Sequence, residues 1–358
     1  MLNFAIIGCG RISYNHFAAA LDNGLNIVAV SDILPERMEE KLTKYGLSEV
    51  KRYSDYREML ANEKLDLVSI CTESGKHGQI GLDCLSSGVN IIVEKPIALS
   101  LKEADRMIDL AEQKGLVLCA CHQNRFNKSI AKIREAMEAG RFGKLFHAAA
   151  HIRWNRGKAY YDQANWRGTW AQDGGALMNQ CIHNIDLLRW MMGREIDEVF
   201  AFTDQLNHPY LEAEDLGLAL VKFKNGAYGL IEGTTNVYPK NLEETLYIFG
   251  SDGTVKAGGK SVNVIEEWAF KDGEDDPEAI KAAYHENPPN IYGFGHKPLF
   301  ADVIRAIETG GRPYVDGHAG RDALELVLAI YKSAATGKPV KLPLTDASSL
   351  DFVGRFDK

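Results

Sequence analysis

Short apolar runs alternate with amphipathic segments along the first third of the chain. The amphipathic segments have helical composition, and several of them end at a glycine that suits a helix C-cap. Apolar runs that alternate with such helices are typical of parallel strands buried on both faces. The pattern therefore predicts a doubly wound α/β domain over residues 1–122. Its expected strands are 3–8, 26–32, 65–72, 90–96 and 116–122.

The rest of the chain, residues 123–358, follows a different pattern. After one helix-like segment, long runs alternate apolar and polar residues as half-buried strands do. Two of these runs flank Asn225-Gly226, a dipeptide that favours a type I′ hairpin turn. Helical periodicity returns at 298–310 and 319–337. We therefore expect a second α/β domain with a mostly antiparallel open sheet and helices packed on one side.

Composition narrows the class of protein. The 358 residues are 45% hydrophobic and 25% charged, as in a globular chain with room for two domains. Acidic residues outnumber basic ones by 49 to 41, and no basic block is present, which argues against a nucleic acid partner. No apolar run has membrane length, and the six cysteines include no C-x-x-C pair. We therefore expect a cytoplasmic protein without disulfides or a bound metal.

The segment GCGRIS, from Gly8 to Ser13, lies between the first expected strand and a helix. Gly8 permits a tight turn, and Gly10 lets the backbone approach a pyrophosphate at the helix N-terminus. Asp32 closes the second strand, where a carboxylate accepts hydrogen bonds from an adenosine ribose and repels the extra phosphate of NADP. These residues predict an NAD site, and a tight turn without a ligand is the alternative.

The tripeptide Glu94-Lys95-Pro96 ends the fourth expected strand, and ligands of open α/β sheets bind at such carboxyl ends. A partly desolvated lysine at this place can donate to a substrate hydroxyl or shuttle a proton. A lysine that extends its ammonium group into solvent fits the sequence equally well.

The stretch GGALMNQCIHNID, residues 174–186, sets Asn179, His183 and Asp186 four and three residues apart on one face of an expected buried helix. An imidazole that titrates near neutral pH can take the proton released when an alcohol loses a hydride. The alternative is a hydrogen-bonded core histidine with its orienting aspartate. For Asp186 alone, a structural helix contact is the favoured interpretation.

Taken together, GCGRIS with Asp32, EKP, HQNRFN (122–127), WRGTW (166–170) and GGALMNQCIHNIDLL resemble the Gfo/Idh/MocA oxidoreductases, in the same order and spacing. The resemblance covers essentially the whole chain. It implies an N-terminal Rossmann domain with a doubly wound parallel sheet, and a C-terminal α/β domain whose open sheet often forms oligomer contacts. It also implies oxidation or reduction at a ring carbon of a sugar or cyclitol.

The resemblance implies roles for individual residues. Lys95 matches the family lysine beside the reacting carbon, and His183 matches the histidine usually given the acid/base role, so both are the expected catalytic residues. The expected substrate contacts are Lys95, Arg125, Tyr161, Asn179 and His183. The expected cofactor contacts are Gly8, Gly10, Arg11, Ile12, Asp32, Thr72, Glu73, His77, Glu94, Lys95, Gln123, Trp166 and Arg167.

Several of these residues also have structural alternatives. Arg125 suits a carboxylate or phosphate ligand and an interdomain salt bridge equally. Trp166 either covers the nicotinamide end of the cofactor or contacts the substrate, or it is a core residue. His77 and His296 stand where the family often has histidine, and each is alternatively a satisfied polar residue.

Two features favour one branch of the family. YYDQANWRGTW followed by DGGALMNQ-x-IH is similar to the branch that acts on UDP-N-acetylglucosaminuronic acid and oxidises the sugar at C3 with NAD. Asn179 stands where inositol dehydrogenase-like members commonly have aspartate, and an amide cannot exchange a proton at neutral pH. The family's usual Thr-Pro after the third strand is Thr72-Glu73 in this chain.

We therefore expect an NAD-dependent dehydrogenase that oxidises a sugar or nucleotide sugar, at C3, and that forms a homo-oligomer of two or four subunits. Alternatives of the same class are an inositol dehydrogenase and a 3-dehydrogenase of free sugars or glycosides. An NAD-dependent glycosidase of this fold is an alternative of another class, since transient oxidation at C3 allows elimination at the anomeric carbon. A non-catalytic NAD sensor is a third class, and it has no need of Lys95 or His183.

Overall fold

The computed structural model describes residues 1–288 and 290–357, and within them the chain divides into two compact units. The first unit comprises Met1–His122 and His296–Arg321, and the second comprises Gln123–Gly295 and the chain from Asp322 onward. His296–Arg321, which falls within the expected second domain (123–358), therefore belongs to the first unit.

The segment that returns to the first unit carries helix α10 (His296–Thr309), which packs against α1 (Ser13–Asp22). The Phe300 ring meets the rings of Phe4 and His16 edge-on, with centroids 5.8 and 5.5 Å apart. All three side chains are fully buried. The apolar face of α10 therefore completes the core of the first unit, which sequence periodicity alone could not assign.

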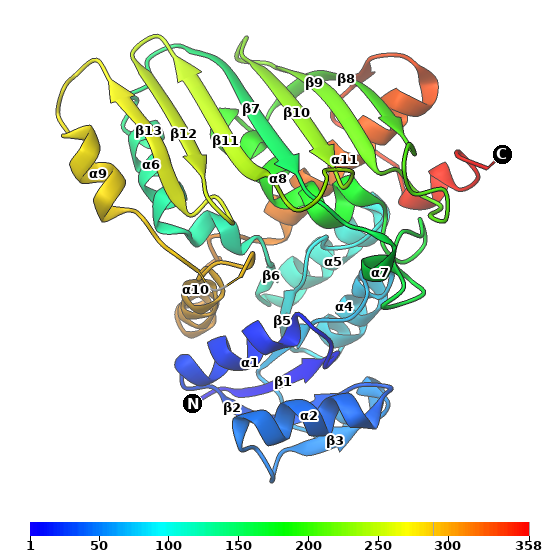
Figure 1. Cartoon of the computed structure of the whole chain (residues 1–358). Coiled ribbons are helices and arrows are strands. Elements are labelled where there is room, and N and C mark those ends of the chain that lie inside the picture. The colour runs from blue at the N-terminus through cyan, green and yellow to red at the C-terminus, as the bar shows by residue number, and fades with distance from the viewer. Residues whose placement is uncertain (289, 358) are drawn as a thin grey trace. The chain divides into compact units, whose positions relative to one another are not determined.

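Within the described residues, the core of the first unit is a six-stranded parallel sheet in the order β3-β2-β1-β4-β5-β6 (Figure 1). Because β1 lies in the middle and the order reverses beside it, the expected doubly wound Rossmann sheet is confirmed. The strands are β1 (Asn3–Ile7), β2 (Asn26–Ser31), β3 (Lys51–Tyr53), β4 (Leu67–Ile70), β5 (Asn90–Val93) and β6 (Leu118–Ala120). The helices are α1, α2 (Pro35–Tyr45), α3 (Tyr56–Asn62), α4 (His77–Ser86), α5 (Leu101–Lys114), α10 and the 3₁₀ turn η1 (Ser74–Lys76).

Strand β3 is the one that the hydrophobic pattern did not predict. It has the sequence KRY, lies at the edge of the sheet and is largely exposed. An edge strand pairs through its backbone and needs no apolar run, so periodicity carries no signal for it.

The described part of the second unit holds an eight-stranded sheet in the order β13-β12-β11-β7-β10-β9-β8-β14. Neighbours are antiparallel except β7 and β10, which run parallel, so the expected mostly antiparallel sheet is confirmed. The strands are β7 (Leu145–Arg153), β8 (Ile196–Asp204), β9 (Leu216–Phe223), β10 (Tyr228–Thr234), β11 (Glu243–Gly250), β12 (Gly253–Gly258), β13 (Val264–Phe270) and β14 (Val340–Lys341). The helices are α6 (Lys128–Glu138), α7 (Lys158–Tyr161), α8 (Ile182–Met192) and α9 (Pro277–Ala283), with the short turns η2 (Gln123–Phe126), η3 (Leu177–Cys181) and η4 (Ser349–Phe352). Helix α11 (Gly317–Thr336) starts in the first unit and continues into the second.

The hairpin at Asn225-Gly226 joins β9 to β10 as expected, but its turn type differs. The Gly226 N–H donates to the Phe223 carbonyl, and Phe223 N–H donates to the Ala227 carbonyl, which closes a three-residue loop. Gly226 has a φ of +88°, whereas Asn225 keeps a negative φ. The turn is therefore a type I turn followed by a left-handed glycine, not the type I′ turn that the dipeptide favours.

Helices α6 and α8 lie along one face of the eight-stranded sheet (Figure 1). The turn η3 approaches the same face closely because β9 and β10 carry Gly217 and Gly233 there. A Cβ at either glycine would lie 2.5 Å from a Leu177 methyl carbon. No helix in the described residues is long and apolar enough to cross a bilayer.

Candidate active site

The turn after β1 has the geometry of a dinucleotide-binding turn. Gly8 has a φ of +91°, and a Cβ there would lie 2.7 Å from the backbone carbonyl carbon of Cys71, so only glycine fits. A Cβ at Gly10 would meet no atom within 4 Å, so the backbone at Gly10 is open to an approaching ligand. Ser13 replaces the third glycine of the fingerprint and is fully buried, with its Oγ donating to the Gly10 carbonyl at 2.7 Å.

Asp32 completes this turn at the end of β2. Its carboxylate accepts the backbone N–H of Cys9 at 2.7 Å and that of Leu34 at 2.9 Å, which fixes its orientation. Each oxygen keeps a further lone pair for a ribose hydroxyl. The open backbone at Gly10 and the oriented carboxylate fit NAD, and the partly or fully exposed Arg11 and Ile12 border the same turn.

His77 does not present its ring to a ligand. The fully buried ring contacts the Pro96 carbonyl through Nδ1 at 2.7 Å and the Thr72 carbonyl through Nε2 at 3.1 Å. Burial lowers the pKa of His77. The structure thus favours the satisfied-polar alternative, in which His77 positions the half-buried Thr72-Glu73 segment and the EKP segment.

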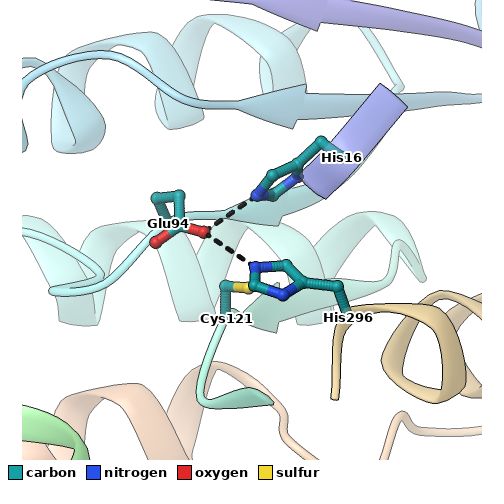
Figure 2. Close-up of side chains that lie close together, drawn as sticks. All are labelled: His16, Glu94, Cys121 and His296. Carbon is teal, nitrogen blue, oxygen red and sulfur yellow. Dashed lines mark hydrogen bonds and ion pairs between the residues drawn. The ribbon is translucent and has the colours of Figure 1, made fainter. Parts of the chain in front are cut away.

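Glu94 of the EKP motif is held by two histidines and by its neighbour (Figure 2). Its Oε1 accepts from His16 Nε2 at 2.8 Å and lies 3.6 Å from His296 Nε2. Its Oε2 accepts the backbone N–H of Lys95 at 3.2 Å. Burial opposes ionisation of Glu94, but the interactions with His16 and His296 outweigh it and keep the pKa of Glu94 well below its usual range.

This network has a consequence for both residues of the motif. The Glu94 side chain is buried and engaged, so the expected cofactor contact from its carboxylate is not available. The half-buried Lys95, in contrast, is anchored at its backbone by that carboxylate. Glu94 therefore positions Lys95, and His296 is a buried member of this network whose Nε2 lies near Glu94 without a hydrogen bond among the described residues.

His16, Glu94, Cys121 and His296 bring four potential metal-ligand atoms within 4.8 Å of one another (Figure 2). Ligand atoms around a tetrahedral zinc ion lie about 3.3–3.7 Å apart, given its bond lengths. The 2.8 Å contact between His16 and Glu94 is a direct hydrogen bond, and His16 Nδ1 is bonded to Ser69 Oγ at 2.9 Å. We interpret the cluster as a hydrogen-bonded network, and the absence of a metal stays a prediction.

In the second unit, Asn179 and His183 lie on consecutive elements of different geometry. The expected single helix over 174–186 is instead a π-helical turn, η3, followed by α8. Both side chains are half-buried, whereas Leu177, Met178, Cys181 and Ile182 are fully buried. Asn179 Nδ2 donates to Asp173, and His183 Nε2 lies 3.4 Å from the Gln123 amide nitrogen. Such π-turns often occur at functional sites, and this one sets the amide and the imidazole on the accessible side of the helix.

A buried carboxyl group explains the glycines that precede this turn. Glu214 Oε1 accepts the Leu177 N–H and the Tyr331 hydroxyl, both at 2.7 Å. Gly175 has a φ of +100°, and a Cβ there would lie 2.1 Å from Glu214 Oε2 and 2.6 Å from Tyr331 Oη. The missing side chain lets Glu214 and Tyr331 clamp the start of η3.

The protonation of Glu214 predicts a pH dependence of stability. Burial raises the pKa of Glu214 from 4.5 to about 8. Between these two values the folded chain binds more protons than the unfolded chain, so this group's contribution to the free energy of unfolding falls as pH rises through that window. We expect Glu214→Gln, a neutral mimic, to flatten the pH dependence. Urea unfolding of both proteins at several pH values measures this, and parallel curves would mean that Glu214 is ionised throughout.

Arg125 and Asp186 form a buried ion pair within the second unit. Arg125 Nε and Nη2 donate to the two Asp186 oxygens at 2.8 and 2.6 Å, and the side chains are only 6% and 2% exposed. The guanidinium also stacks 4.7 Å from the Trp190 ring. The expected substrate contact from Arg125 is therefore corrected to a structural pair, because its charge is already neutralised, and the structural alternative for Asp186 is favoured.

The aromatic residues before the π-turn also differ from expectation. Tyr161 is buried, with its hydroxyl 3.4 Å from Thr235 Oγ1, so it belongs to the core and not to the substrate contacts. Its neighbour Tyr160 is half-buried and accepts a hydrogen bond from Arg167. Trp166 is half-buried beside Arg167, with the guanidinium carbon 4.6 Å from its ring, so it is not a core residue.

Sequence reasoning missed Tyr160, Arg156, Gln180 and Glu214. Arg156 Nε donates to Gln180 Oε1 at 3.0 Å, and Gln180 Nε2 donates to Tyr160 Oη at 2.8 Å. The run RGKAYY holds an arginine and a tyrosine four residues apart, which was the available signal for this group. Glu214 had no such signal in the sequence, because its partners Leu177 and Tyr331 lie 37 and 117 residues away.

Each unit contributes functional groups that suit alcohol oxidation. The first unit carries the dinucleotide turn and a lysine anchored at the carboxyl end of β5. The second unit carries a half-buried imidazole 3.4 Å from the Gln123 amide nitrogen. A lysine that can donate to a hydroxyl, an imidazole that can accept a proton and a dinucleotide turn are groups that dehydrogenases use.

Two family models match the chain. The Gfo/Idh/MocA model described as "Oxidoreductase family, NAD-binding Rossmann fold" matches residues 2–122. The model described as "Oxidoreductase family, C-terminal alpha/beta domain" matches residues 134–342.

Individual relatives are similar over nearly the full length. The WlbA dehydrogenase from Bordetella pertussis, solved in complex with NADH and UDP-GlcNAcA, is 35% identical with a TM-score of 0.86, and 96% of this chain and 98% of that chain are covered. The WlbA dehydrogenase from Chromobacterium violaceum, in a complex with the same two molecules, is 35% identical with a TM-score of 0.85 and 96% of each chain covered. Myo-inositol 2-dehydrogenase from Thermotoga maritima is 28% identical, covering 95% of this chain and 98% of that protein.

Proposed function

The chain belongs to the Gfo/Idh/MocA oxidoreductases, and from this premise we propose that it oxidises the C3 hydroxyl of a nucleotide sugar of the UDP-N-acetylglucosaminuronic acid class. That it is an NAD-dependent oxidoreductase follows from the family. The observation that supports the substrate is the 35% identity, over 96% of the chain, to two dehydrogenases bound to NADH and UDP-GlcNAcA.

NAD supplies the hydride acceptor when bound. Gly8, Gly10 and Asp32 hold its diphosphate and ribose, and the Asp32 carboxylate is already oriented by two backbone N–H groups. Arg11, Ile12, Thr72, Glu73, Gln123, Trp166 and Arg167 remain proposed cofactor contacts.

Lys95 and His183 are the proposed catalytic residues. The Lys95 ammonium group donates to the substrate hydroxyl and lowers the cost of its ionisation. The His183 imidazole takes the hydroxyl proton as hydride leaves the carbon, because an imidazole accepts a proton near neutral pH. Asn179 hydrogen-bonds a neighbouring hydroxyl but exchanges no proton.

A substrate panel tests this proposal. The protein is mixed with NAD and, separately, with UDP-N-acetylglucosaminuronic acid, myo-inositol, glucose and a p-nitrophenyl glycoside. We expect NADH absorbance to rise with the nucleotide sugar and the product to be lighter by two hydrogens. Fast oxidation of myo-inositol alone would favour the inositol alternative instead. Release of p-nitrophenol without NADH would identify the glycosidase alternative.

The Asp32 carboxylate predicts a preference for NAD over NADP. We expect NAD to bind at least tenfold more tightly than NADP, because the 2′-phosphate of NADP would face Asp32, and 1.4 kcal/mol of repulsion corresponds to about tenfold. The segment SDILPER offers a guanidinium only at Arg37. Titration of both cofactors into the protein measures the ratio, and Asp32→Ser serves as the variant that should narrow it. Equal affinities in the parent protein would contradict this role.

The open face of the eight-stranded sheet supports the proposed homo-oligomer. Phe202, Leu220 and Tyr228 are 66%, 60% and 57% exposed, and Leu220 pairs directly across the sheet with the exposed Leu230. Large adjacent apolar side chains on one face mark an interface between subunits.

Light scattering at micromolar concentration checks the oligomer, for which we expect a dimer or tetramer. Leu220→Lys should shift it towards smaller species, whereas Lys64→Gln, at an exposed lysine of the first unit, should not. A monomer in the parent protein would contradict the proposed oligomer.

The six buried cysteines, none of them in a disulfide, support a cytoplasmic location.

A further inference from the structure

Among the described residues, three arginines of the second unit have no ion pair with a carboxylate: Arg156, Arg167 and Arg355, of which Arg355 donates to the Tyr331 backbone carbonyl. Six arginines of the same unit do pair with Asp or Glu: Arg125, Arg134, Arg141, Arg153, Arg189 and Arg194.

The guanidinium groups of Arg156 and Arg167 flank one tyrosine. The guanidinium carbon of Arg156 lies 5.1 Å from the Tyr160 ring centroid, and that of Arg167 lies 4.3 Å from it. Each guanidinium also lies 4.6 Å from a tryptophan ring, that of Trp154 or Trp166. Stacking on aromatic rings fixes the planes of both groups without neutralising their charges.

The polar partners of these arginines are all neutral. Arg156 Nε and Nη1 donate to the Gln180 and Asn241 side-chain carbonyls and to the Asn155 backbone carbonyl. Arg167 Nη1 donates to the Tyr160 hydroxyl, and its Nε is buried with no hydrogen-bond partner among the described residues. A buried cationic donor without an acceptor costs free energy. The Arg167 Nε–H group therefore favours a ligand that brings an acceptor to it.

This group of residues is connected to the proposed substrate site. Gln180 Nε2 donates both to Tyr160 Oη at 2.8 Å and to Asn179 Oδ1 at 3.0 Å. The nearest carboxylate on the α7 segment, Asp162, is already paired with Lys158 at 2.6 Å. Neither Arg156 nor Arg167 pairs with a carboxylate among the described residues, although the Asp173 carboxylate accepts a hydrogen bond from Asn179 in the same group.

We propose that Arg156 and Arg167, on either side of Tyr160, form a subsite for an oxyanion of the substrate, either a carboxylate on the sugar ring or a phosphate. The inference rests on the proposed function for its place in the reaction. Guanidinium groups suit both anions, since they present parallel N–H donors to two oxygens. The subsite accounts for discrimination between anionic and neutral sugars, which Lys95 and His183 cannot supply because every ring hydroxyl satisfies them.

Calorimetric titration of the full chain, saturated with NAD, tests the subsite. The ligands are UDP-glucuronate, UDP-glucose and glucuronate, which carry both anions, the diphosphate alone and the carboxylate alone. The variants are Arg156→Gln and Arg167→Gln, and Arg194→Gln is the matched control because that exposed arginine already pairs with Asp322. Thermal unfolding of each variant is measured as a check on folding.

We expect each variant to weaken binding of the anionic ligands by about tenfold to a hundredfold, as for loss of a hydrogen bond between charged groups. The Arg194→Gln control should bind all three ligands with the affinities of the parent protein. A loss with UDP-glucuronate and glucuronate but not with UDP-glucose assigns the carboxylate, and a loss with both UDP-sugars but not with glucuronate assigns the diphosphate.

Unchanged affinities in both variants, for all three ligands, would overturn the subsite. Turnover of the nucleotide sugar by those variants at the parental rate would then leave the proposed function intact. Conversely, both variants could weaken anion binding while the protein oxidises only neutral cyclitols. That result would support the subsite and contradict the proposed function.

Discussion

Replacing His183 with alanine is expected to lower turnover by about two to four powers of ten, because general-base catalysis contributes that much. NAD affinity should hardly change, since the dinucleotide turn belongs to the other unit. Lys95→Met should cause a comparable loss. Asn179→Ala should chiefly raise KM, because an amide hydrogen bond contributes about 0.5–1.5 kcal/mol and transfers no proton.

Steady-state kinetics on the best substrate of the panel, with thermal unfolding of each variant, separates the two interpretations of His183. The pH profile of kcat/KM should lose its acidic limb in His183→Ala. Near-normal turnover in a variant that unfolds several degrees earlier would instead make His183 a core histidine.

The second large effect concerns the ion pair of Arg125 and Asp186. Asp186→Ala should reduce the free energy of unfolding by about 3–5 kcal/mol, because it leaves a buried guanidinium without its counter-charge. The two side chains are 6% and 2% exposed, so solvent screens the pair very little. Urea unfolding measures the loss, and Arg134→Ala, which breaks the more exposed pair with Glu138, is the matched control with a loss under about 1 kcal/mol.

A double replacement by apolar residues, Arg125→Met with Asp186→Leu, should recover most of that stability, since no charge is then left unpaired. If Asp186→Ala were as stable as the parent, Arg125 would have another partner, and a ligand contact from Arg125 would return as an explanation.

The sequence predicted the parts of the fold that depend on local patterns. Buried apolar runs gave five of the six parallel strands, and Gly8, Gly10 and Asp32 lie where the fingerprint requires them. The motif with Asn179 and His183 was found from its spacing. These features are encoded within a few residues, so one sequence suffices to find them.

What the sequence could not predict depends on partners far along the chain. Arg125 was compatible with a ligand until Asp186, 61 residues away, proved to hold it. Glu214 accepts the Leu177 N–H at the start of the π-turn, in space that Gly175 leaves free, and no periodicity in the sequence shows this contact. The adjacent Tyr160 and Tyr161 cannot be told apart from the sequence. In the structure Tyr161 is the buried one, with its hydroxyl beside Thr235 Oγ1.

The central claim is that this protein removes a hydride from C3 of an anionic nucleotide sugar, and isotope transfer tests it most directly. UDP-N-acetylglucosaminuronic acid deuterated at C3 is incubated with the protein and NAD, and the reduced cofactor is analysed by mass spectrometry. The account predicts NADH that carries one deuterium, together with a slower rate than with the undeuterated sugar. NADH formed without deuterium, or no reduction of NAD by this substrate at all, would contradict it.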